Sequence, residues 1–425
     1  MGKLKTFWKS LGPGLIVGAA DDDPAGIAIY ALAGAKFGLA VLWTVLGTLP
    51  FMIIIQRMAG RIGLISGRGL AANMKRHYPI WMLVVITTLI ATANIINIGA
   101  DISAMTAAIK LMVPFPAIAL AIIISLTVII LVIILPYRII AKYLKWIAIV
   151  MFSYILAPFF ISQPWREILV QTFTPHWSFN KEYIAIIVAI FGTTISPYLF
   201  FWQASEEVEE RRQTKELTGM IPSIEPQTRK DKTFIKNEIS TMYTDIRVGM
   251  IFSNLITFFI IILASSTLFK QGFNQFSSIE EMASLLRPLA GGYANLLFLV
   301  GILASGILAI PIFAGSAAYA IAETVGWREG LDRDFRKAPQ FYTVMIIATL
   351  LGIAIPLLGL QPVNILYITG IIFGLISPVA ILLVIHMANN PKIMGQYTSR
   401  RHSNIIAYGL FIIMTTSIIM MFVYK

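Results

Sequence analysis

The chain has 425 residues, of which 57% are hydrophobic and 13% charged, with a formal net charge of +12 and a mean hydropathy of +0.79. Soluble domains contain about 25% charged residues, so this composition excludes a soluble globular protein and indicates a polytopic membrane protein. The basic excess lacks the aromatic-basic motifs of nucleic-acid binding, and the absence of cysteine excludes disulfides and thiolate metal sites.

Eleven apolar segments are each near twenty residues or longer, the length that crosses about 30 Å of hydrocarbon. We predict membrane spans at 12–33, 40–58, 80–109, 115–135, 140–161, 183–205, 247–268, 293–324, 341–360, 363–387 and 404–424. Most of the 33 Lys and Arg residues lie in alternate loops, starting with the amino-terminal one. This asymmetry predicts a cytoplasmic amino terminus and an extracellular carboxy terminus in the cell membrane.

One polar insert, from Glu206 to Asp245, interrupts the apolar pattern. We expect a solvated cytoplasmic connector there, with a short helix in EEVEERRQTKEL.

The first span carries Asp21, Asp22, Asp23 and Pro24 at its middle. A carboxylate at mid-bilayer costs on the order of 3 kcal/mol, so it is rarely placed there without a partner or a task. Proline removes a backbone donor and clashes with the preceding turn, which predicts a break in the helix. Broken backbone at membrane depth survives where it is buried by protein or lines a polar cavity, so we interpret this segment as half of an ion site.

A second interruption falls in the sixth span, at Pro197, after the small polar residues Thr193, Thr194 and Ser196. A single proline often only kinks a packed helix. Two interrupted helices in matching positions of successive five-helix blocks instead indicate an inverted-repeat transporter with its site between the breaks. The predicted repeats are 12–161 and 183–387, followed by an extra helix at 404–424.

The segments GPGLIVGAADDDPAGIAIYALAGAKFG and FGTTISPYLFFWQ resemble signature helices 1 and 6 of the natural-resistance-associated macrophage protein (NRAMP) family of divalent-metal transporters. The resemblance implies an all-α membrane protein with a LeuT-like fold: a 5+5 inverted repeat plus an eleventh helix, with helices 1 and 6 broken at mid-membrane. In the family's Asp-Pro-Gly-Asn motif the Asp and Asn bind the metal. Asp23 and Pro24 match this motif, whereas Gly26 stands in the asparagine position.

The family's Met-Pro-His motif in helix 6 is also changed in this sequence. Ser196 replaces the methionine, Tyr198 replaces the histidine, and Gln203 aligns with a second family histidine. Loss of the soft thioether leaves oxygen ligands, which suit Mg²⁺ or Ca²⁺. The pattern is therefore similar to the NRAMP-related magnesium transporter (NRMT) branch, and loss of both histidines argues against proton coupling.

Six residues are expected at the metal site. By the resemblance, Asp23 is the direct ligand, Thr193 offers its carbonyl as the family alanine does, and Asn364 lies near a family glutamine of helix 10. Asp21 and Asp22 hold the ion directly or through its hydration shell, unless they make salt bridges or hydrogen bonds inside the bundle. Ser196 contributes its hydroxyl, and for it and Thr193 the alternative is capping of the helix break.

Further polar residues are assigned to the transport path. Asn97 and Asp101 share one face of the third span with Asn94, although hydrogen bonding between helices explains that face equally well. Thr194, Tyr198 and Gln203 belong to the same path in the sixth span. Core or surface roles are expected for the four histidines His77, His176, His386 and His402.

The sequence thus predicts a transporter, not an enzyme, which imports Mg²⁺ and also Mn²⁺ by alternating access. We expect it to lie in the lipid bilayer and to need neither a cofactor nor an obligate protein partner. Three alternatives remain open. A proton-coupled Mn²⁺ or Fe²⁺ importer needs an acid such as Asp101 in place of the histidines. An amino-acid transporter of the same fold would bring a substrate carboxylate against three acids, and an intramembrane aspartyl protease needs aspartates from two helices.

Overall fold

The computed structural model describes residues 18, 20–134, 150–218, 229–272 and 278–424, and the regular structure in these residues is helical. Ten helices within this part of the chain are long and apolar enough to cross a membrane. The apolar helix Val150–Phe160 belongs to the predicted fifth span, whose earlier residues lie outside the described part. The prediction of an all-α polytopic membrane protein is confirmed.

The α-helices, in chain order, are α3 (Pro24–Phe37), α4 (Trp43–Ser66), α5 (Leu70–His77), α6 (Ile80–Lys110), α7 (Ala117–Ile134), α9 (Trp165–Phe173), α10 (Lys181–Thr194), α11 (Pro197–Thr218), α12 (Arg229–Thr267), α13 (Ile279–Ser284), α14 (Arg287–Ala290), α15 (Ala294–Val325), α16 (Pro339–Gly352), α17 (Ala354–Leu357), α18 (Pro362–Asn389), α19 (Pro391–Met394) and α20 (Arg401–Val423).

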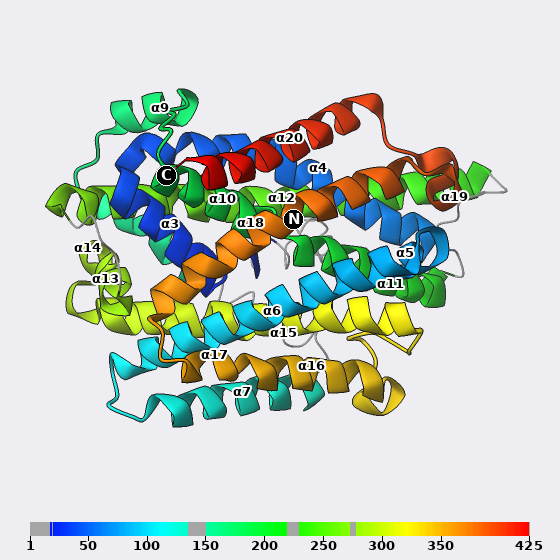
Figure 1. Ribbon diagram of the computed structural model, residues 1–425, viewed down its shortest axis with the longest axis horizontal. Coiled ribbons are helices and arrows are strands. Elements are labelled where there is room, and N and C mark those ends of the chain that lie inside the picture. Colours follow the sequence, from blue (N-terminus) through cyan, green and yellow to red (C-terminus); the bar gives the residue numbers. More distant parts are fainter. Residues whose placement is uncertain (1–17, 19, 135–149, 219–228, 273–277, 425) are drawn as a thin grey trace, which may run out of the picture.

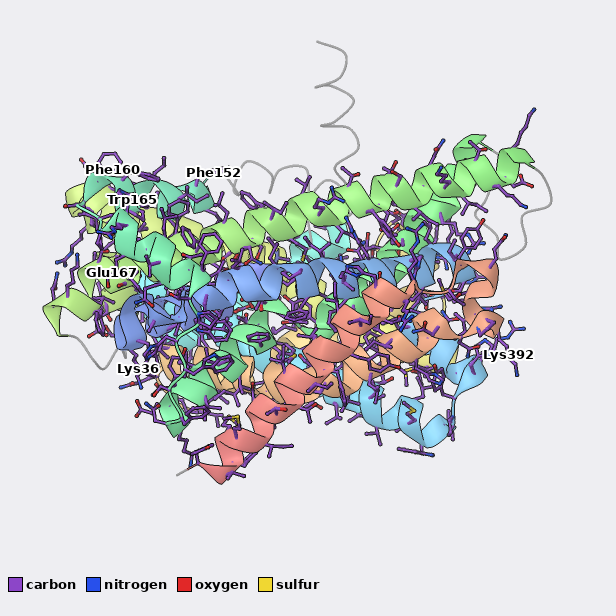
Figure 2. The ribbon with its side chains drawn as sticks, turned by 90° about the horizontal axis from the view of Figure 1, so that it is seen from above. Lys36, Phe152, Phe160, Trp165, Glu167 and Lys392 are labelled. Carbon is purple, nitrogen blue, oxygen red and sulfur yellow. The ribbon has the colours of Figure 1, made fainter. Side chains whose placement is uncertain are left out.

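The long helices follow the long axis of the molecule, and α6, α15, α16 and α7 run side by side along one edge (Figure 1). Elsewhere α3 packs on α12, α10 on α18, and α11 on α4. Lys36, Trp165 and Glu167 lie at one end of this bundle and Lys392 lies at the other (Figure 2). Charged residues therefore lie at both ends of the bundle.

Both predicted helix breaks are confirmed. The chain is helical at Asp21, bends at Asp22 and Asp23, and becomes helical again where α3 begins at Pro24. In the sixth span α10 ends at Thr194, and α11 begins at Pro197 after two intervening residues. Proline lacks the N–H that would continue the preceding helix, and its fixed φ suits the first position of the next one.

The helix predicted in EEVEERRQTKEL is confirmed, but the prediction of a connector over the rest of the insert, to Asp245, is wrong. Helix α11 continues to Thr218 and α12 begins at Arg229, so only 219–228 of this insert lie outside the described residues. Glu, Lys, Arg and Gln are strong helix formers, and Glu207 and Glu209 are buried against the rest of the molecule, so these helices run on beyond their apolar parts.

Two other spans differ from their predicted limits. Helix α4 runs eight residues past residue 58 to Ser66, because Arg61 finds polar partners in Ser399, at 2.6 Å, and Tyr243, at 3.2 Å. The ninth span is divided after Gly352 into α16 and α17.

Candidate metal-binding site

Asp23 joins the first helix break to α6. Its backbone is extended, with φ −67° and ψ 171°, and its Oδ1 accepts a hydrogen bond of 2.6 Å from the backbone N–H of Gly26, which caps α3. Its Oδ2 accepts a 2.8 Å hydrogen bond from the side-chain amide of Asn97. The carboxylate is thus fixed in position by both helices, and only 3% of the residue is exposed.

Gly26 keeps open a small space lined by oxygen atoms from both breaks. A Cβ atom on this residue would lie 2.9 Å from the carbonyl oxygen of Asp21, 3.2 Å from Oδ1 of Asp23 and 3.4 Å from Oγ1 of Thr193. Carboxylate, carbonyl and hydroxyl oxygens are the ligands that hard divalent cations take. We call this space the Gly26 cradle.

The cradle is not a site of converging carboxylates or imidazoles. Among the residues that the structure describes, no three His, Cys, Asp or Glu side chains gather in a way that would hold a metal ion. A cation in the cradle would therefore take one carboxylate with neutral oxygens and water, the arrangement in which Mg²⁺ usually keeps much of its hydration shell.

At the second break, hydroxyl groups satisfy carbonyl oxygens that the interrupted helix leaves free. The Ser196 hydroxyl lies 2.7 Å from the carbonyl oxygen of Gly192 and 2.8 Å from that of Thr193. Thr194 bonds back to Ile190 within its own helix at 2.8 Å. Thr193 therefore faces the cradle with its hydroxyl, Ser196 caps the end of α10, and Thr194 bonds only within its own helix.

Ser377 on α18 adds a contact that sequence reasoning missed. Its hydroxyl lies 2.9 Å from the carbonyl oxygen of Ile195, inside the second break. A single serine in an apolar span gives no signal of which neighbouring helix it will meet.

The third span contributes two predicted path residues directly beside Asp23. The Asn97 amide that donates to Asp23 also lies 3.4 Å from Oδ2 of Asp101. Asp101 is fully buried. Asn94 faces another direction, because its amide donates to the carbonyl oxygen of Phe313 on α15 at 3.0 Å.

Tyr198 and Gln203 lie on α11, beyond the second break. The Tyr198 hydroxyl is 3.4 Å from the carbonyl oxygen of Ala20, and its ring packs 4.2 Å from that of Phe313 and 5.4 Å from that of Phe373. Gln203 donates to Glu207 one turn further along, at 2.8 Å. Both are at most 2% exposed, so this side of the cradle is closed by packed side chains.

Asn364 is not brought to the other predicted ligands. Since α18 begins at Pro362, Asn364 lies in its first turn at one end of the span, where its exposed amide bonds Gln361 at 3.2 Å. The predicted limits of the tenth span are correct, but Asn364 lies at the end of this span and not at mid-membrane beside the other predicted ligands. His386 lies away from the predicted ligands, as expected, and its Nδ1 is 2.5 Å from the hydroxyl of Tyr78.

Asp21 and Asp22 point their side chains toward α12. The Ser253 hydroxyl lies 2.8 Å from Oδ2 of Asp21 and 3.3 Å from Oδ1 of Asp22, and both aspartates are fully buried. The three consecutive acids are therefore divided, with Asp23 toward α6 and the other two toward α12. Ser253 was not predicted, for the same reason as Ser377.

Comparison with known proteins identifies relatives along nearly the whole chain. A family model described as natural resistance-associated macrophage protein-like matches residues 14–424. The divalent metal cation transporter MntH of Caldanaerobacter subterraneus subsp. tengcongensis is 24% identical over 403 residues, which cover 93% of this chain and 88% of that protein.

Solved structures show the same fold. The Eremococcus coleocola manganese transporter superposes with a TM-score of 0.78 at 18% identity, covering 97% of this chain and 86% of that one. A nucleobase-cation-symport-1 family transporter in a closed conformation superposes with a TM-score of 0.57 at 13% identity, covering 97% and 90%. The expected LeuT-like fold is thereby confirmed.

Proposed function

The chain belongs to the natural resistance-associated macrophage protein-like family, and from this premise we propose that it carries divalent metal cations across the cell membrane through the Gly26 cradle. It is a transporter and not an enzyme. The observation that carries the proposal is the convergence of oxygens from both helix breaks on one point, with Asp23 as the charged ligand. Thr193 supplies a hydroxyl, and Asp21 supplies its backbone carbonyl.

The transported ions include Mn²⁺, with Mg²⁺ accepted by the same site. Relatives named as divalent metal and manganese transporters support Mn²⁺. The proposal that Mg²⁺ is also transported depends on the ligand atoms alone. The cradle offers only oxygen atoms and lacks the thioether that would favour softer metals. The site therefore discriminates weakly between these two ions.

Transport proceeds by alternating exposure of the cradle to the two faces of the membrane. The residues around it are closed to solvent: Asp23, Thr193 and Ser196 are 3%, 5% and 1% exposed. A site at paired helix breaks is typical of inverted-repeat carriers, in which one part rocks against the other. With the amino terminus cytoplasmic, a negative interior drives uptake by about 2.3 kcal/mol per charge and 100 mV.

Proton coupling is a second candidate function, favoured by the position of Asp101. The family's helix 6 histidines are absent, but this buried carboxyl group connects to Asp23 through the single side chain of Asn97. When a metal ion binds Asp23, the charge near Asp101 changes, and at this short separation the change alters the electrostatic energy of the Asp101 carboxylate. Asp101 is thus the group that replaces the histidines.

The proposal is tested by flux into proteoliposomes containing the full-length protein. Mn²⁺, Mg²⁺ and Ca²⁺ are supplied outside in turn, with a metal-sensitive dye and a pH dye inside. We expect saturable Mn²⁺ uptake that external Mg²⁺ competes with. Protein-dependent uptake of an amino acid, with no uptake of any divalent cation, would contradict the proposal.

A further inference from the structure

A second group of buried oxygens lies between the first helix break and α12, on the side of the break away from Asn97. Asp21 and Asp22 approach one hydroxyl group, that of Ser253. A hydroxyl carries a single proton, so it can donate fully to only one of the two carboxylates. Oδ1 of Asp21 and Oδ2 of Asp22 are buried and have no hydrogen-bond partner.

Two further hydroxyls are buried in this region. Tyr30 is fully buried and Thr257 is 1% exposed, and their two hydroxyls interact with each other. The Tyr30 hydroxyl interacts electrostatically with Asp21 and Asp22 and faces Thr257, which lies one turn beyond Ser253 on α12. Unpaired buried polar atoms are costly, and a group of them in one place indicates a missing partner.

The charge balance shows what kind of partner is missing. Four aspartates, Asp21, Asp22, Asp23 and Asp101, lie buried around the break. Ion pairs in the described part of the chain join Lys36 to Glu182, Arg212 to Glu329 and Lys337 to Asp334, none of them involving these aspartates. With Asp101 assigned to carry a proton, one divalent cation in the cradle balances Asp23 and the charge of only one further carboxylate, and burial makes the remaining negative charge unfavourable.

We propose that Asp21, Asp22 and Ser253, with the hydroxyls of Tyr30 and Thr257, form a second binding site for a hard divalent cation. The proposal deepens the proposed function and rests on it. The ligand set consists of oxygen only, with two carboxylates to balance the charge of one divalent ion, as Mg²⁺, Mn²⁺ or Ca²⁺ requires.

The two sites share one residue. The side chain of Asp21 belongs to the second site, while its backbone carbonyl oxygen faces the Gly26 cradle. A cation held by the side chain fixes the backbone of the break, and with it the direction of this carbonyl. The second ion is therefore a structural partner of the transport site, and it remains bound while the cargo ion exchanges.

The test is the number of Mn²⁺ ions that the purified full-length protein binds in equilibrium dialysis. We expect about two ions per chain for the unmodified protein and about one for Asp22→Asn, since a neutral amide removes one of the two negative charges that balance the second ion. Asp23→Asn also binds about one ion, and the double variant binds none. Ser253→Ala keeps both carboxylates and weakens the second ion about tenfold.

Ser125→Ala is the matched control, because the Ser125 hydroxyl is buried and bonds only its own helix at Ala121, at 2.8 Å. It should bind as many ions as the unmodified protein, and a thermal melt of each variant verifies folding. A single ion in the unmodified protein, removed by Asp23→Asn, would overturn the second site and leave the proposed function standing. Retention of both ions by the Asp22→Asn variant would also overturn the second site. Absence of any bound ion, together with absence of flux, would remove both proposals.

Discussion

The side-chain amide of Asn97 donates a 2.8 Å hydrogen bond to Oδ2 of Asp23, and this bond crosses from the third span to the break in the first. It orients the carboxylate whose other oxygen faces the Gly26 cradle. Outer partners of this kind fix the geometry of a metal ligand without touching the metal.

Replacement of Asn97 tests this relationship. We expect Asn97→Ala to weaken Mn²⁺ binding about 10- to 100-fold, as loss of such partners commonly does. Ser103→Ala on the same helix is the control, because the Ser103 hydroxyl bonds only Gly99 of its own helix, at 2.8 Å. Unchanged Mn²⁺ affinity in Asn97→Ala would show that Asp23 does not depend on this amide.

Gly26→Ala fills the cradle with a single methyl group. The new Cβ would approach the carbonyl oxygen of Asp21 to 2.9 Å and occupy the space between Asp23 and Thr193. We expect Mn²⁺ uptake to fall at least about tenfold while the protein stays folded, because one methylene is enough to disturb a packed interior. Gly409→Ala, where a Cβ meets no atom within 4 Å, should transport normally.

Asp101 is expected to carry the proton that accompanies the metal. In proteoliposomes Mn²⁺ uptake should acidify the lumen, and Asp101→Asn should abolish acidification while leaving downhill metal flux measurable. The physical reason is that an amide cannot exchange the proton that a carboxyl group exchanges. Mn²⁺ uptake without acidification in the unmodified protein would instead support the uncoupled mechanism that the missing histidines indicate.

Glu209 connects α11 to the segment after α15. Its carboxylate accepts hydrogen bonds from the backbone N–H groups of Leu331, at 2.9 Å, and Asp332, at 3.0 Å, and from the hydroxyl of Tyr319. Glu209→Ala leaves the Asp332 N–H without its acceptor, and Leu331 and Tyr319 keep only the longer hydrogen bonds to Tyr319 and Glu206, at 3.2 and 3.3 Å. This loss costs about 2 kcal/mol, and we expect a lower thermal midpoint. The exposed Glu182, which is paired with Lys36 at 3.4 Å, is the control, and its replacement by alanine should leave the midpoint unchanged.

The sequence predicts the spans and both breaks because these follow from local properties. Apolar length marks the membrane, and Pro24 and Pro197 interrupt a helix wherever it packs. The same reasoning does not predict where a helix begins or ends outside its apolar segment. Hydropathy marks only the apolar part, so the first residues of α12, from Arg229, were predicted to be connector, although the helix expected in EEVEERRQTKEL is present in α11.

Contacts between spans were harder to predict than the spans. Asp23, Thr193, Asn97 and Asp101 were found because a carboxylate, a break or a polar face is unusual in an apolar helix. Ser253 and Ser377 were missed because single hydroxyls are common in membrane helices, and their partners depend on which helices pack together. Asn364 was misplaced for a related reason, since its height in the membrane depends on where α18 begins.

The central claim is that Asp23 binds the transported ion in the Gly26 cradle. Its most direct test is the initial rate of Mn²⁺ uptake into proteoliposomes by Asp23→Ala beside the unmodified protein, at equal amounts of folded protein. The claim predicts uptake at the level of protein-free liposomes for the variant, because the cradle then lacks its only charged ligand. Uptake by Asp23→Ala at the rate of the unmodified protein would contradict it.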